Sequence, residues 1–128
     1  MIYVDSSVAL AKLLAEQRQP PDSFWDHDLA SSRLLEYEVW TRVHARQLAY
    51  ALGDQTDTLL KRIQFSELTP TVLARALAAF PVAVRTLDSL HLATVEYLRG
   101  FGQDVALASF DERMLAAAHA LHIPIYEF

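Results

Sequence analysis

The sequence has no cysteine, and this absence removes several kinds of chemistry at once. Disulfide bonds, thiolate nucleophiles and zinc sites built from cysteine are all excluded. The absence also agrees with a reducing compartment, so we expect the protein to act in the cytoplasm. Any metal ion that it binds must be held by oxygen or imidazole ligands.

A surplus of basic residues is missing as well. The 128 residues include 11 Lys and Arg against 16 Asp and Glu, which is a formal net charge of −5. Proteins that hold nucleic acid by bulk electrostatics carry a positive footprint, so this composition argues against simple nucleic-acid binding. It does not argue against a metal-dependent nuclease, because the ligand cluster of such an enzyme is itself acidic.

Long apolar runs and internal repeats are absent too. Although 52% of the residues are hydrophobic, no stretch reaches the roughly 18 uncharged apolar residues of a membrane helix. Asp5 comes too early for a signal peptide, whose basic region should come first. We therefore expect no membrane segment and a single domain over residues 1–128.

Short apolar runs alternate with segments of helical spacing along the chain. Strands are predicted at residues 2–4, 29–32, 63–68, 105–110 and 123–128. Helices are predicted over residues 8–17, 33–52, 54–63, 70–80, 87–100 and 111–122. This alternation predicts an α/β fold, a three-layer α/β/α sandwich around a central, mainly parallel sheet of about four to five strands.

Acidic residues follow two of the predicted strands. Asp5 comes after the first strand and Asp111 after the strand at 105–110. In parallel sheets, ligands bind beyond the carboxyl ends of the strands. Asp88, at the start of its predicted helix, can face the same edge. Carboxylates crowded at one edge repel one another unless a cation intervenes, and Mg²⁺ and Mn²⁺ favour oxygen ligands.

Each of these acids also has a plainer interpretation. Asp88 lies in the stretch RTLDSLHLA, where Thr86 can cap a helix whose first turn favours an acid. Asp5 and Asp111 can likewise cap the helices that follow them. The residue pattern alone leaves metal binding and helix capping open.

Four stretches together carry a family resemblance. They are MIYVDSSVALAKLL, SSRLLEYEVWTR, LDSLHLATVEYL and LASFDERMLAAAHALHIPIY, which begin at residues 1, 31, 87 and 107. In this order, over essentially the whole chain, the sequence resembles PIN-domain ribonucleases, especially the VapC-like toxins of type II toxin-antitoxin pairs. The fold implied by the resemblance is the PIN-like sandwich that the alternation of strands and helices also predicts.

The resemblance implies the residues of the site. Its acidic cluster consists of four catalytic and metal-binding residues, Asp5, Glu38, Asp88 and Asp111.

Two serines are expected to support the acidic cluster, and one further glutamate competes with Glu38 for a place in it. Ser7 and Ser109 match the hydroxyl positions that support the cluster, and the family often has Thr where Ser109 stands. Glu36 is the rival of Glu38, because helical periodicity alone does not decide which of the two faces the site. The spacing from Ser32 selects Glu38.

The function implied by the resemblance is metal-dependent cleavage of RNA. One or two Mg²⁺ or Mn²⁺ ions would activate a water for attack on a phosphodiester. A toxin of this kind implies a cognate antitoxin protein and a homodimer. Two alternatives remain: a PIN-domain nuclease that processes RNA without an antitoxin, and a non-catalytic interaction module whose acids cap helices.

Basic residues and histidines indicate less about function than the acids do. Lys12, Arg42 and Arg46 are candidates for binding RNA phosphates, although ordinary surface pairing such as Glu38 with Arg42 explains them equally simply. His91 follows Asp88 by three residues, but the resemblance implies no catalytic histidine. A structural, hydrogen-bonded role is therefore expected for His91.

Overall fold

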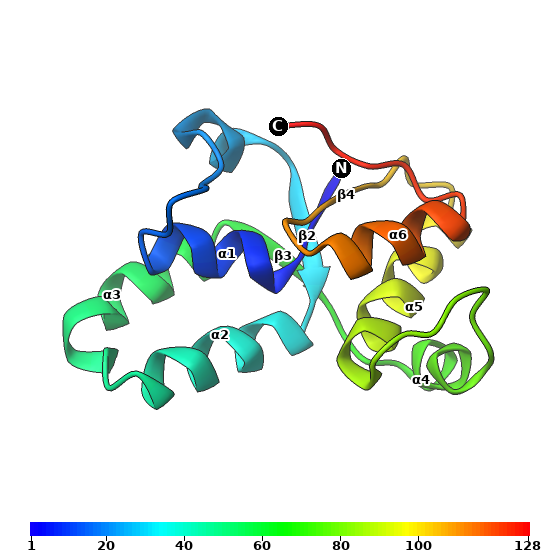
Figure 1. Cartoon of the computed structure of the whole chain (residues 1–128), viewed down its shortest axis with the longest axis horizontal. Helices are drawn as coiled ribbons and strands as arrows, with labels where there is room; N and C mark the ends of the chain where they lie inside the picture. Colours follow the sequence, from blue (N-terminus) through cyan, green and yellow to red (C-terminus); the bar gives the residue numbers. More distant parts are fainter.

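The computed structural model describes residues 1–128 and has one parallel sheet at its centre (Figure 1). Its strands are β1 (Ile2–Val4), β2 (Leu29–Ser32), β3 (Ile63–Ser66) and β4 (Ala106–Ala108), in the order β3-β2-β1-β4. All neighbouring strands run parallel, so their carboxyl ends lie at one edge.

Six α-helices cover the two faces of this sheet. They are α1 (Ser6–Leu13), α2 (Leu34–Ala45), α3 (Ala49–Leu60), α4 (Pro70–Leu77), α5 (Thr86–Gly100) and α6 (Glu112–Ala120), with a 3₁₀ helix, η1, at Asp22–Asp26. Figure 1 shows α1, α2 and α3 on one side of the strands and α4, α5 and α6 on the other. The predicted three-layer α/β/α sandwich is confirmed.

The side chains of β1 alternate between two apolar clusters. Ile2 and Val4 pack into the larger cluster, which α1, α2 and α3 cover. Tyr3 points the opposite way, into a second cluster that contains Leu92 of α5 and Met114 of α6. This alternation is the two-residue period of a strand buried on both faces, and it fixes the direction in which β1 delivers the next residue, Asp5.

The single helix predicted over residues 33–52 is wrong. The chain breaks between α2 and α3, where Gln47 adopts a left-handed conformation with φ of 58°. The N–H of Leu48 donates to the carbonyl of Val43 across the end of α2, which is the closing bond of a Schellman motif. Glycine usually marks such an end, but Gly53 lies within α3 and Gln47 takes the turn position.

The strand predicted at residues 123–128 is reduced to one parallel bridge between Leu107 and Ile125. The N–H of Leu107 donates to the carbonyl of Pro124, and the N–H of Tyr126 donates to that of Leu107, both at 2.8 Å. Proline has no N–H to give to a ladder, so the segment lies against β4 without extending the sheet. No helix of the fold combines the length and the apolar character that crossing a bilayer requires.

Candidate active site

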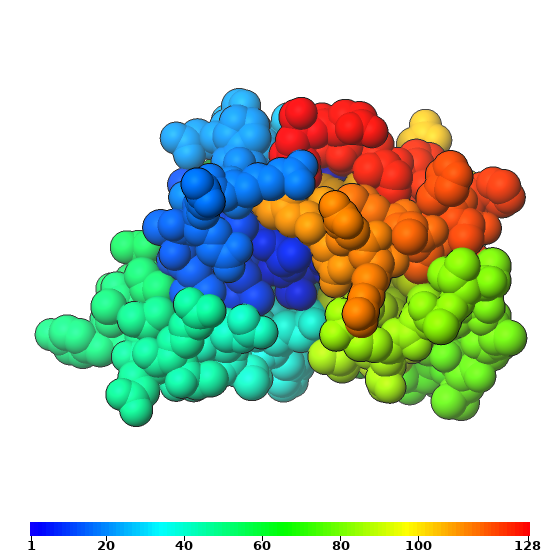
Figure 2. All heavy atoms as spheres, viewed as in Figure 1, coloured from blue at the N-terminus to red at the C-terminus, as the bar shows by residue number.

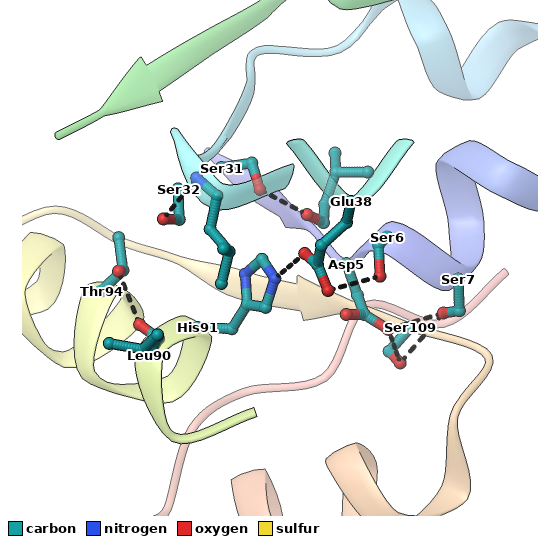
Figure 3. Close-up of polar contacts among 12 residues, drawn as sticks. Asp5, Ser6, Ser7, Ser31, Ser32, Glu38, Leu90, His91, Thr94 and Ser109 are labelled. Atoms are coloured by element: carbon teal, nitrogen blue, oxygen red, sulfur yellow. Dashed lines mark hydrogen bonds and ion pairs between the residues drawn. The ribbon is translucent and has the colours of Figure 1, made fainter. Parts of the chain in front are cut away.

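Asp5 lies immediately after β1 and is buried, with 4% of its surface exposed. The hydroxyls of Ser7 and Ser109 both donate to its Oδ2 atom, at 2.6 and 2.8 Å (Figure 3). Asp5 occupies the N-cap position of α1 but accepts no capping hydrogen bond. Helix capping therefore does not explain this carboxylate.

The two serines also join the start of α1 to the loop after β4. The backbone N–H of Phe110 donates to Ser7 Oγ, and that of Asp111 donates to Ser109 Oγ, both at 3.0 Å. Figure 2 shows the surface on which the beginning of α1 and the beginning of α6 come together between the two helical layers. Ser7 and Ser109 thus hold Asp5 and Asp111 on adjoining segments.

Glu38 of α2 turns toward the same place. Its Oε1 atom lies 2.5 Å from Nε2 of His91, and its Oε2 atom accepts a long hydrogen bond of 3.5 Å from Ser6 (Figure 3). Glu36 faces elsewhere and accepts from the guanidinium of Arg33 at 3.0 Å. The structure accordingly places Glu38, rather than Glu36, beside the residue that follows Asp5.

Asp88 and Asp111 flank an arginine that the sequence patterns did not single out. Arg85 Nε lies 3.8 Å from Asp88 Oδ2, and Arg85 Nη2 lies 4.0 Å from Asp111 Oδ2. Asp111 also caps α6, because its Oδ1 accepts from the backbone N–H of Arg113 at 2.9 Å. The expected capping by Thr86 is wrong, since Thr86 is already the first residue of α5.

The charges of the aspartates influence one another. Partial burial raises the pKa of the Asp88 carboxyl above its usual range, and the negative charges of Asp111 and Asp5 raise it further. The positive charge of Arg85 and that of His91 offset part of this rise. Asp5, Asp88 and Asp111 therefore share one electrostatic environment, in which like charges make ionisation costly.

His91 and Tyr3 are buried next to Glu38. Burial lowers the pKa of the His91 imidazole, but its hydrogen bond to Glu38 and the charges of Glu38, Asp5 and Asp88 outweigh burial, so that the pKa is raised overall. Burial raises the pKa of the Tyr3 hydroxyl far above its usual range, which keeps this group protonated. The expected hydrogen-bonded role of His91 matches its contacts with Glu38 and Tyr3.

Comparison with known proteins shows the family of the chain. The profile of the PIN domain family matches residues 2–120. The chain belongs to the PIN domain family. Ribonuclease VapC35 of Mycobacterium tuberculosis is 26% identical over 130 residues, which cover 98% of this chain and 95% of that protein. Ribonuclease VapC47 of the same organism is 30% identical over 124 residues, which cover 91% of this chain and 88% of that protein.

The donors of this PIN domain fit a hard divalent ion. Asp5 is buried and takes part in no ion pair, and buried carboxylates are normally paired or bound to a metal. Glu38, Asp88 and Asp111 add further carboxylate oxygens, the ligands that Mg²⁺ and Mn²⁺ prefer. In this structure no three of the acidic and histidine side chains are arranged closely enough to form a complete set of metal ligands.

Two basic residues that were not among the candidates lie beside Asp88. Arg85 and Arg113 line a cavity of about 400 Å³ that Asp88 also faces. Lys12 instead pairs with Asp22 of η1 at 3.1 Å.

The remaining two candidates lie on α2 and just beyond it. Arg42 and Arg46 are exposed, and the simple pairing of Glu38 with Arg42 is not formed. Arg85 is the extended residue just before α5 and lies three positions before Asp88, close enough in the chain for its guanidinium to reach that carboxylate.

Removing the Ser109 hydroxyl should destabilise this PIN domain. In Ser109→Ala, Asp5 loses one of its two donors and the N–H of Asp111 loses its acceptor. The free energy of unfolding, measured by urea denaturation, should fall by about 1–3 kcal/mol. Ser23→Ala serves as a control, because Ser23 is exposed and its change should stay within about 0.5 kcal/mol. Equal stability of the two variants would contradict the supporting role of Ser109.

Proposed function

We propose that this PIN domain, residues 1–128 acting as one unit, is a metal-dependent endoribonuclease and the toxin of a toxin-antitoxin pair. The observation that carries the proposal is a set of acids near the carboxyl edge of a parallel sheet, three of them coupled through their charges and the fourth linked to α5 through His91. These are Asp5, Glu38, Asp88 and Asp111. The names of the relatives, Ribonuclease VapC35 and Ribonuclease VapC47, support RNA as the substrate.

The four acids would hold Mg²⁺ or Mn²⁺. When bound, such an ion supplies an activated water for attack on a phosphodiester and stabilises the leaving oxygen. Ser7 and Ser109 bond to Oδ2 of Asp5, which leaves its Oδ1 without a hydrogen-bond partner. His91 bonds to Oε1 of Glu38, and Oε2 has only the long hydrogen bond of 3.5 Å from Ser6. The protein thus presents oriented negative charge and needs no nucleophilic side chain of its own.

Arginine side chains at the rim would contact RNA phosphates. The side chain of Arg85 is 67% exposed beside Asp88, so that it can meet solvent and substrate. Guanidinium groups bind phosphates through charge-assisted hydrogen bonds, and such local contacts act despite the acidic total charge. Lys12, Arg42 and Arg46 would extend this contact over a wider surface.

The partners follow from the toxin assignment. An active ribonuclease in the cytoplasm would damage its own cell, so a cognate antitoxin that covers the acidic site is part of the proposal. A homodimer is also proposed. Leu73, Leu77 and Val82 are exposed around α4 and line a cavity of about 700 Å³, and apolar patches of this kind often mark interfaces.

Substitution of the two neighbouring glutamates should separate a catalytic from a surface role. Glu38→Gln keeps the shape of the side chain but removes the charge, and RNA cleavage should fall by at least about 100-fold. Glu36→Gln is the matched control, because Glu36 pairs with Arg33 and not with the site residues. Its cleavage rate should stay near that of the unchanged protein. Rates would be measured on a labelled RNA with Mn²⁺, and the opposite ranking of the two variants would refute the choice of Glu38.

Loss of Arg85 should weaken substrate binding more than catalysis. In Arg85→Ala the KM for RNA should rise by about tenfold, the scale of one lost charge-assisted contact, with a smaller change in kcat. Arg99→Ala, at the far end of α5, is the control and should leave KM unchanged. Equal effects of both substitutions would indicate that only the overall charge matters.

Calorimetry with Mn²⁺ should distinguish an enzyme from a non-catalytic module. The unchanged protein should bind the ion, and Asp5→Asn should lose that binding while circular dichroism shows that it remains folded. No binding by the unchanged protein, together with no cleavage, would favour a module whose acids serve structure alone. Cleavage by a protein with no antitoxin partner would favour an RNA-processing enzyme.

A further inference from the structure

A buried chain of hydrogen bonds runs from the backbone of β2 to Glu38. The N–H of Ser32 donates to the Tyr3 hydroxyl at 3.0 Å, and this hydroxyl lies 2.7 Å from Nδ1 of His91. The opposite ring nitrogen of His91, Nε2, contacts Oε1 of Glu38. Tyr3 and His91 are 0% and 1% exposed, so solvent cannot replace these partners.

The order of donors directs a hydrogen toward Glu38. An ionised Glu38 can only accept, so Nε2 of His91 carries the hydrogen of their contact, and the Tyr3 hydroxyl, which accepts from Ser32, donates to Nδ1 when the ring is neutral. A neutral imidazole that accepts at Nδ1 carries its hydrogen on Nε2, and a charged imidazole carries one there as well. His91 therefore donates to the Glu38 carboxylate in either state.

This chain also connects the elements that carry three of the four acids. Tyr3 lies on β1 two residues before Asp5, His91 lies on α5 three residues after Asp88, and Glu38 lies on α2. A glutamate side chain has several rotatable bonds and would otherwise sample many positions. The hydrogen bond to a fully packed histidine selects one of them.

We propose that His91, oriented by Tyr3, is a positioning residue that holds Glu38 in the geometry needed to bind a divalent ion. The inference rests on the proposed function, since it assigns Glu38 to the ion. The bond to His91 occupies Oε1, whereas Oε2 has only the long contact with Ser6 at 3.5 Å and stays available. Partners behind a metal ligand commonly change metal affinity by about 10- to 100-fold.

The test measures Mn²⁺ affinity by calorimetry in His91→Leu, His91→Gln and Tyr3→Phe, with folding checked by thermal melting. His91→Leu removes the donor, and its Kd for Mn²⁺ should rise by about 10- to 100-fold. His91→Gln keeps an N–H on the side chain and should recover much of the affinity. Tyr3→Phe removes the group that orients the ring, and its Kd should rise to a smaller extent.

Leu92→Ala is the matched control for a merely structural effect. Leu92 is the buried neighbour of His91 on α5, and its truncation removes packing but no polar contact. Its melting temperature should fall while its Kd for Mn²⁺ stays unchanged. An equal Kd in His91→Leu and the unchanged protein would overturn the inference, as would equal weakening in Leu92→Ala.

Two outcomes distinguish a failure of the positioning role from a failure of the proposed function. If the unchanged protein does not bind Mn²⁺, the proposed function itself fails. If it binds and His91→Leu does not fold, Tyr3→Phe decides the matter, and an unchanged Kd in that variant overturns the positioning role.

Discussion

The buried carboxylate of Asp5 is the constraint on which the arrangement of this PIN domain depends. A carboxylate that is nearly closed to solvent is costly unless it is hydrogen-bonded and its charge is balanced. Ser7 and Ser109 meet the first requirement from two different segments, and no basic side chain forms an ion pair with Asp5 to meet the second. Because β1 lies between β2 and β4, it delivers Asp5 to the middle of the sheet edge, where the other acids and a cation can reach it.

The helix-capping alternative applies to the acids unequally. Asp111 caps α6 with one oxygen and keeps the other toward Arg85, so capping occupies only part of this carboxylate. Asp5 caps nothing through its side chain, and Glu38 bonds to His91 rather than to a neighbour on its own helix. Helix capping alone therefore leaves Asp5 and Glu38 without an explanation, and the divalent ion of the proposed function would give these two acids and the other two a common partner.

Much of the fold follows from local patterns, and much of the site does not. Short apolar runs predict parallel strands with a common carboxyl edge, and this edge is enough to bring Asp5 and Asp111 together. The contact of His91 with Tyr3 spans 88 positions and depends on how α5 packs on β1, so no local pattern reveals it. The end of α2 was missed for a different reason, because a Gln took the left-handed position that usually indicates glycine.

Cleavage of a defined RNA by the purified protein, with and without divalent ions, tests the central claim most directly. We expect no cleavage in the presence of EDTA and cleavage when Mn²⁺ or Mg²⁺ is restored. Cleavage that persists at full rate in EDTA, with the four acids intact, would contradict a metal-dependent site.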